Sequence, residues 1–154
     1  MIAVLQRVSS ASVVSDGVPT GACKAGFLIL LGVLKGDSSN DALLLADKIA
    51  KLRVFSDADD KMNLSLADIG GEVLIVSNFT LGADYSHGNR PSFFDSAPPD
   101  EAVVLYEEFL GLMRDRVPHV ACGIFGADMH ISAEADGPVT IVMDSKKLVK
   151  GKKA

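Results

Sequence analysis

The fold is decided by residues 25–34, which read AGFLILLGVL. This apolar run is about half of the roughly 20 residues that a membrane-spanning helix needs. Two glycines, Gly26 and Gly32, interrupt it. A short apolar run with such breaks is typical of a buried strand. We therefore expect a globular domain built around this strand, with no membrane partner.

Further strands are predicted on either side of this run. Residues 2–8 alternate in apolar character, and residues 11–15 form a second strand-like stretch before a turn signal at 16–17. Residues 72–76 (EVLIV) predict a central strand that ends at Ser77. Three closing strands are expected at 120–125, 129–133 and 139–143, with 136–138 as the joint before the last.

Two helices are predicted from the 3.6-residue spacing of apolar side chains. Ser38 and Asp41 have the spacing of a capping box that starts the first helix. Its buried stripe is Ala42, Leu45, Ile49 and Leu52. The second helix follows Pro98 and Pro99, ends before Pro118, and has the stripe Ala102, Leu105, Tyr106, Phe109, Leu112, Met113 and Val117.

Many strands with two segregated helices predict an α+β fold, with barrel-like or layered β-sheets in a single domain over residues 1–145. Residues 56–71 are polar and rich in turn-forming residues. The acidic side chains of Asp57, Asp59 and Asp60 lack the glycine and distal glutamate of a calcium loop. We expect a solvated turn there and no metal site.

The charge distribution bears on the class of partner. The formal net charge of −5 argues against a polyanionic partner, because nucleic-acid binding depends on neutralised phosphates. Residues 146–154 (KKLVKGKKA), however, carry five lysines and no acid. This C-terminal tail is either a solvated end or an electrostatic contact for RNA backbone, and the sequence leaves both interpretations open.

Compartment and cofactors follow from the N-terminus and the cysteines. The N-terminus lacks the basic start and cleavage site of a secretory signal. Cys23 and Cys122 have neither zinc-ligand spacing nor a nearby histidine pair. We expect a cytoplasmic protein with reduced thiols, no cofactor and no metal.

Four short motifs carry the functional signal, since the common catalytic motifs of hydrolases and nucleotide-binding proteins are absent. They are SNFTL at 77–81, RPSF at 90–93, FGADM at 125–129 and DGPVT at 136–140. Together with AVLQRVSSASV near the N-terminus and the stretch DDKMNLSLADIGGEVLIVSNFTL, the chain resembles the D-aminoacyl-tRNA deacylase family over nearly its whole length. The resemblance implies a homodimer with an α+β, barrel-like fold. It implies hydrolysis of the ester that joins a D-amino acid, or glycine mischarged on tRNA-Ala, to the 3′ adenosine of tRNA.

The catalytic segment implied by the resemblance is Ser77, Asn78, Phe79 and Thr80. It follows a predicted strand, so its backbone N–H groups should be free of the sheet and able to hold an ester oxyanion. The resemblance places the Phe79 N–H and the Thr80 side chain at the reacting centre. From the residues alone, Thr80 is better explained as a cap at the end of the strand.

Chiral selection is implied for Gly137 and Pro138, with Val139 beside them. The dipeptide follows a turn-prone aspartate, which suits an ordinary tight turn and raises the chance of a cis bond. By resemblance it is a Gly-cisPro motif that enters the partner subunit's pocket, where its carbonyl oxygens leave no room for an L side chain. Arg7 alternates with apolar residues; by resemblance it holds this segment, and a surface arginine is the alternative.

The remaining substrate-binding residues come from two other motifs. The loop with Pro91, Ser92 and Phe93 resembles the family's pocket wall, with Phe93 a candidate contact for adenine, although a loop aromatic also suits a plug over the core. Met129 is implied from the FGADM motif.

No Ser/His/acid set is evident among the three histidines, so the resemblance implies a reaction assisted by the terminal ribose 2′-hydroxyl of the RNA, with Thr80 as nucleophile the alternative. Two positions depart from the family pattern: Asn78 stands in place of glutamine and Ala135 in place of asparagine. Two other functions therefore stay open. One is a deacylase of relaxed chirality that acts on L-alanyl-tRNA, and the other is an inactive RNA-binding homologue.

Overall fold

The computed structural model describes residues 1–148, so most of the predicted lysine-rich tail lies outside the described residues. The elements in chain order are β1 (Ile2–Ser15), β2 (Val18–Cys23), β3 (Gly26–Gly32), α1 (Ser39–Lys51), β4 (Phe55–Ser56), β5 (Met62–Leu64), α2 (Leu66–Ile69), β6 (Glu72–Ser77), η1 (Phe79–Gly82), α3 (Pro99–Arg114), β7 (Val120–Cys122), β8 (Met129–Asp144) and η2 (Ser145–Lys147). The fold is α+β in one domain, as the sequence predicted.

Strand β1 organises the main sheet. It pairs antiparallel with β3 along its first half, with β2 along its second half, and with β8 along nearly its whole length. On the far side of β3 the pairing changes: β6 runs parallel to β3, and β7 runs parallel to β6. The carboxyl ends of β3 and β6 therefore meet at one edge of the sheet, where ligands of parallel sheets commonly bind.

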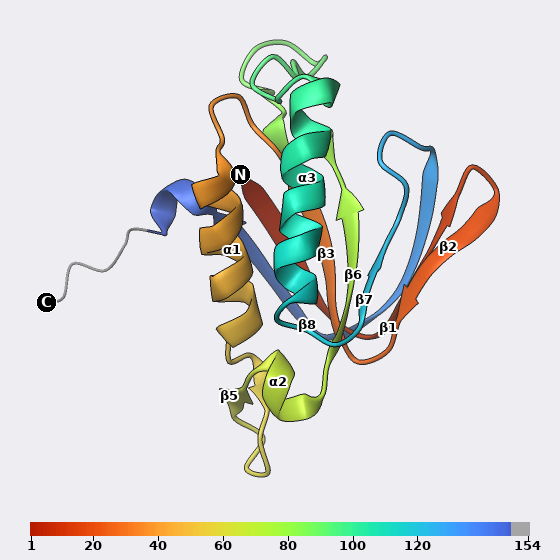
Figure 1. Ribbon diagram of the computed structural model, residues 1–154, viewed down its shortest axis with the longest axis vertical. Helices are drawn as coiled ribbons and strands as arrows, with labels where there is room; N and C mark the ends of the chain where they lie inside the picture. The colour runs from red at the N-terminus through yellow and green to blue at the C-terminus, as the bar shows by residue number, and fades with distance from the viewer. Residues whose placement is uncertain (149–154) are drawn as a thin grey trace, which may run out of the picture.

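Helices α1 and α3 lie side by side over one face of the sheet (Figure 1). The main core fills the space between them and the sheet, where the side chains of Ile29, Leu45, Ile75 and Phe109 are fully buried. The predicted helix stripes face the core: Leu52, Leu105 and Leu112 are half-buried against it, and the other members are buried, namely Ala42, Leu45, Ile49, Ala102, Tyr106, Phe109, Met113 and Val117. Within residues 1–148 no helix is long and apolar enough to span a membrane.

The sheet curls until its two ends almost touch, as Figure 1 shows for β2 and β7. A Cβ atom on Gly21 of β2 would lie 2.7 Å from the carbonyl oxygen of Cys122 on β7, so only glycine allows this approach. Next to this contact in sequence, the ring nitrogen of His119, just before β7, lies 3.0 Å from the carbonyl oxygen of Ala22 on β2. A second, smaller core that includes Val13, Leu28 and Val76 fills the inside of the curl.

The number and length of the strands differ from the prediction. Residues 2–15 form one strand rather than two, and residues 129–144 form one strand with no turn at 136–138. Gly137 and Pro138 instead lie where the β1–β8 register shifts, and the ladder continues beyond them. A glycine and a proline signal a break in regular pairing, and a bulge within a strand satisfies that signal as well as a hairpin does.

Two further boundaries also differ from the prediction. The strand expected at 120–125 ends at Cys122. The turn expected at 56–71 contains the short β4–β5 pair and the four-residue helix α2. The acidic side chain of Asp57 closes that pair by accepting hydrogen bonds from the N–H groups of Asp59 and Lys61, at 2.9 and 3.0 Å.

A buried charge network joins the start of α1 to the end of the described chain. Asp41, whose side chain is 8% exposed, accepts hydrogen bonds from the Ser38 N–H at 2.9 Å, the Ser145 hydroxyl at 2.7 Å and the Lys146 ammonium at 2.9 Å. The predicted capping box is thus confirmed. Burial alone would raise the pKa of Asp41, but these donors together hold it well below its usual value.

Replacing Asp41 by asparagine should lower the free energy of unfolding at pH 7 by about 2 kcal/mol, because Ser145 and Lys146 lose an ionised acceptor. The folded-state pKa of Asp41 is depressed, so its contribution is present above its unfolded pKa, about 4, and is lost as the pH falls below that value. Urea unfolding at pH 7 and pH 3 should therefore show a smaller pH dependence for the variant. Asp47→Asn is the matched control on α1: its partner is Arg116 at 2.7 Å, its side chain is 45% exposed, and we expect a loss below about 1 kcal/mol. Equal losses in the two variants would contradict the assignment.

Candidate functional site

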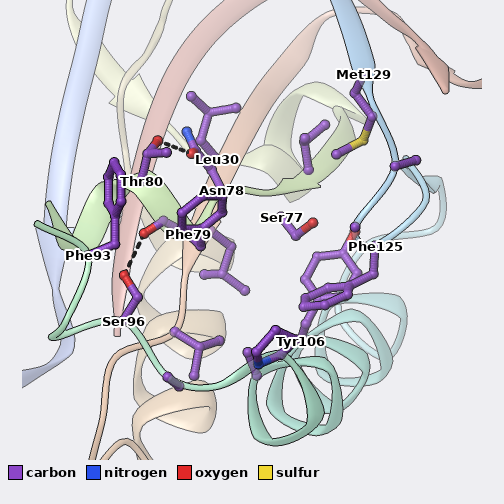
Figure 2. A pocket seen from close by; sticks show the side chains of 18 of the residues that line it. Leu30, Ser77, Asn78, Phe79, Thr80, Phe93, Ser96, Tyr106, Phe125 and Met129 are labelled. Atoms are coloured by element: carbon purple, nitrogen blue, oxygen red, sulfur yellow. Dashed lines mark hydrogen bonds between the residues drawn. The ribbon is translucent and has the colours of Figure 1, made fainter. Parts of the chain in front are cut away.

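A cleft of about 870 Å³ opens at the carboxyl ends of β3 and β6. Its walls come from η1, from the start of α3 and from the loop that joins β7 to β8 (Figure 2). Of the site residues predicted from the sequence, the structure brings six together in its lining: Ser77, Asn78, Phe79, Thr80, Phe93 and Met129. The three sequence motifs that contribute these residues are therefore neighbours in space, although they are separate in the chain.

The turn after β6 is held in place from two sides. The Asn78 N–H donates to the carbonyl oxygen of Leu31 at 2.8 Å, so the expectation that all the N–H groups of this segment are free was wrong for Asn78. Ser96 donates its hydroxyl to the carbonyl oxygen of Phe79 at 2.7 Å. Phe79 is the first residue of the 3-10 helix η1, and the first N–H groups of a helix have no acceptor within it. The Phe79 N–H is thus the segment's best candidate for an oxyanion donor.

The side chains of Asn78 and Thr80 interact directly. The Thr80 hydroxyl donates a short hydrogen bond to the Asn78 side-chain oxygen, as the dashed line in Figure 2 marks. This contact turns the Thr80 proton toward Asn78 and leaves the oxygen lone pairs for other donors. Asn78, which is one methylene shorter than the glutamine expected at this position, therefore binds a residue of its own turn, Thr80.

Aromatic side chains form two walls of the cleft. Phe79 and Phe93 pack edge to face, with ring centroids 5.1 Å apart and an interplanar angle of 72°. Tyr106 and Phe125 form a tilted pair at 5.6 Å on the opposite wall (Figure 2). The sequence analysis assigned Tyr106 to the core and did not predict its place in the cleft lining. An amphipathic helix gives no signal for which buried residue also borders a cavity.

The cleft is nearly uncharged. Only Asp128 and Tyr106 among its lining residues are ionisable. Burial raises the pKa of Tyr106 above its usual value, and its hydroxyl donates to the carbonyl oxygen of Ile75 at 3.2 Å. No histidine of the described chain lines the cleft, and the exposed ring of His130, the nearest to it in sequence, lies 3.6 Å from the Asp128 carboxylate. Within residues 1–148 no group of three or more His, Cys, Asp or Glu side chains could hold a metal ion.

The other predicted site residues lie outside this cleft. Pro91 and Ser92 are exposed on the loop before Phe93, where Asp84 and Ser92 exchange backbone hydrogen bonds at 2.7 and 2.8 Å. Arg7 pairs with Phe27 on β3, four residues before Leu31, which binds the η1 turn. That separation is about 13 Å along the strand. Gly137, Pro138 and Val139 lie on β8 near Arg7 and hence away from the cleft.

Arg7 braces the backbone of this second region. Its guanidinium donates to the carbonyl oxygen of Asp136 at 3.1 Å and to the buried carbonyl oxygen of Val54 at 2.8 Å, and Arg7 is 9% exposed. The Gly137-Pro138 bond is cis, and Gly137 has a φ of 128°. A Cβ atom on Gly137 would lie 2.8 Å from the backbone nitrogen of Val139 and 3.2 Å from the Arg7 guanidinium, so position 137 requires glycine.

The comparisons with known proteins agree along nearly the whole chain. The model of the D-Tyr-tRNA(Tyr) deacylase family matches residues 4–144. A D-aminoacyl-tRNA deacylase of Anaeromyxobacter dehalogenans is 53% identical over 148 residues, covering 96% of this chain and 99% of that protein. A D-aminoacyl-tRNA deacylase of Thermotoga petrophila is 51% identical over 148 residues with the same coverage.

Solved structures share the fold. A structure described as c-Myc DNA Unwinding Element Binding Protein is 37% identical, with a TM-score of 0.88 over 94% of this chain and 98% of that chain. A probable eukaryotic D-amino acid tRNA deacylase is 16% identical, with a TM-score of 0.79 over 92% of this chain and 97% of that chain, which is a likeness of fold alone.

Replacing Arg7 by methionine should lower the free energy of unfolding by about 2–3 kcal/mol, because the buried carbonyl oxygen of Val54 and that of Asp136 lose their donor. Denaturant unfolding measures this loss. Arg53→Met is the control, since the Arg53 guanidinium also donates to a backbone carbonyl oxygen, that of Asn63, at 2.9 Å but in an exposed position. We expect that variant to change stability by roughly 0.5 kcal/mol or less. A comparable loss in the two variants would show that Arg7 does not brace the Gly137-Pro138 segment.

Proposed function

The chain belongs to the D-Tyr-tRNA(Tyr) deacylase family and is a hydrolase of D-aminoacyl-tRNA, and we propose that its cleft binds the aminoacyl end of the tRNA in a cytoplasmic homodimer. The substrates are esters of D-amino acids and of glycine mischarged on tRNA-Ala. The observation that carries this proposal is the separation of the two predicted halves of the site within one subunit. The cleft holds the proposed catalytic residues, and the proposed chiral filter lies elsewhere on the surface.

The dimer rests on the outer edge of β8. This 16-residue strand pairs only with β1 within residues 1–148, and almost all of its residues are exposed or half-buried. Apolar side chains are among them, with Ile131 exposed to 38% and Val142 to 69%. A long unpaired edge with exposed apolar side chains favours association with another chain. A second copy seated there would bring its own residues near this surface.

The chiral filter is formed by Gly137 and Pro138 of the partner subunit, supported by Val139 and Arg7. Backbone carbonyl oxygens of this segment would accept a hydrogen bond from the substrate's α-amino group and occupy the space that an L side chain needs. Position 137 requires glycine, and Arg7 holds the carbonyl of residue 136, so the segment is braced in one conformation. Arg7 contacts both the carbonyl oxygen of Asp136, at 3.1 Å, and its carboxylate, at 3.3 Å, and neither contact needs a side chain at position 135, so Ala135 is compatible with this brace.

Hydrolysis proceeds by orientation and electrostatic stabilisation. A water molecule attacks the ester carbonyl carbon, the Phe79 N–H stabilises the oxyanion, and the ester oxygen leaves on the ribose with a proton. The terminal 2′-hydroxyl of the RNA assists the attack. This mechanism does not use Thr80 as the nucleophile. In its support, the Thr80 hydroxyl donates to the Asn78 amide oxygen, and an amide oxygen is too weak a base to accept the proton.

Incubation with D-Tyr-tRNA, L-Tyr-tRNA, L-Ala-tRNA and Gly-tRNA tests the function. We expect release of the D-amino acid and glycine, with L-aminoacyl-tRNA left intact, as measured by loss of the ester. Hydrolysis of the L-alanyl ester would instead support a deacylase of relaxed chirality, and binding without hydrolysis of any ester would support an inactive RNA-binding homologue. Light scattering should give the mass of a dimer, and full activity in a single subunit would contradict the cross-subunit filter.

Replacing Thr80 by alanine should leave substantial turnover of D-Tyr-tRNA, within about tenfold of the original kcat, because no covalent intermediate is formed on Thr80. Thr80→Val keeps the shape of the side chain and serves as its control. Single-turnover kinetics separates binding from the chemical step. Complete loss of hydrolysis with tRNA binding intact would make Thr80 the nucleophile and overturn the mechanism.

A further inference from the structure

An exposed aromatic ring lies just outside the cleft. Phe94 is 75% exposed, so its ring is accessible to a partner. The Lys35 ammonium lies over one face of its ring, 3.4 Å from the centroid. That distance is typical of a cation–π contact, which steadies the ring and leaves its other face free. We call this pair the Lys35–Phe94 shelf.

Backbone hydrogen bonds hold the two segments that carry the shelf. The Lys35 N–H donates to the carbonyl oxygen of Asp95 at 2.9 Å, and the Ala97 N–H donates to the carbonyl oxygen of Val33 at 3.0 Å. These bonds flank a β-bridge between Leu34 and Ser96. The shelf is thus held by the segment after β3 and the segment before α3, and it does not depend on a single loop.

The shelf adjoins the cleft directly. Phe93, the preceding residue, lines the cleft and packs against Phe79, while Ser96 and Ala97 on the other side of Phe94 also line it. A polymer whose end occupies the cleft must leave across its rim. Phe94 follows Phe93 by one Cα–Cα step of about 3.8 Å, so an adjacent unit of such a polymer is within reach of the shelf.

The chemistry of the shelf fits single-stranded RNA. Nucleobases stack on exposed aromatic rings without regard to sequence, and a neighbouring cation neutralises the backbone phosphate. Lys35 has no carboxylate within salt-bridge distance in the described part of the chain, so its charge is available, although the exposed carboxylate of Asp95 is next to the shelf in sequence. The chain has a net charge of −5, so most of its surface repels a phosphate. A lysine beside the cleft makes that place more favourable for a phosphate than the rest of the surface.

We propose that the Lys35–Phe94 shelf binds the nucleotide that precedes the terminal adenosine of the tRNA, with its base on the free face of Phe94 and its phosphate near Lys35. This subsite rests on the proposed function, since it requires the terminal adenosine in the cleft. It binds and positions the RNA outside the reacting centre. Its loss therefore weakens binding of substrates that extend past the terminal adenosine and spares substrates that end there.

Two substrates distinguish this subsite from the cleft: D-Tyr-tRNA and the D-tyrosyl ester of adenosine alone. In Phe94→Ala and Lys35→Ala we expect kcat/KM for D-Tyr-tRNA to fall about tenfold through a higher KM. The value for the adenosine ester should stay within about twofold. The Lys35 variant should also show a weaker dependence of KM on salt. Val104→Ala and Lys48→Ala are the controls, since they remove an exposed apolar side chain and an exposed lysine elsewhere on the surface. We expect them to leave kcat/KM unchanged for both substrates.

Three results would overturn the subsite: an equal loss on the two substrates, no loss on D-Tyr-tRNA, or dissociation of the dimer in the shelf variants. If the unaltered protein hydrolyses neither ester, the proposed function fails, and the subsite is tested by binding. In fluorescence anisotropy with a short single-stranded RNA that ends in the tRNA 3′ nucleotides, weaker binding by the shelf variants supports it and unchanged binding overturns it.

Discussion

The antiparallel pairing of β1 with β8 is the constraint on which the rest of the structure depends. β1 also pairs with β3 along its first half and with β2 along its second, so one strand sets the register of three others. Because β1 pairs with β3 and then with β2 along one of its edges, the sheet curls until β2 approaches β7. It also leaves the outer edge of β8 without a strand partner in the described chain. The same pairing thus shapes the barrel and exposes the edge proposed for dimerisation.

The parallel β3–β6 pair has a different role, because it positions the cleft in which we propose that the reaction takes place. The two strands end together, and the η1 turn that follows β6 is tied back to β3 by the Asn78–Leu31 hydrogen bond. Phe79 and Thr80 are thereby fixed at the cleft by backbone contacts, and the Thr80 hydroxyl is committed to Asn78. A cleft lined mainly by backbone and neutral side chains suits the ester carbonyl group, which is itself uncharged.

Local patterns predicted some features correctly. The capping residues Ser38 and Asp41 fixed the start of α1, and the 3.6-residue stripe of α3 identified its buried face, since each signal lies within a few residues of its effect. The Gly-Pro signal at 137–138 was assigned to a turn between strands and proved to be a bulge within β8. Sequence spacing shows that regular pairing breaks there, but only the partner strand decides whether the chain reverses or continues.

The sequence by itself determined the α+β class, the central apolar strands, the two main helices and the family motifs. These depend on side-chain polarity at short range and on residue identity. Only the tertiary structure decided that six residues from three separate motifs line one cleft, that Arg7 also binds Val54, and that the Gly137-Pro138 segment lies away from the cleft in the same subunit. The physical reason is that strand pairing and register join residues more than a hundred positions apart, and no local pattern encodes those distances.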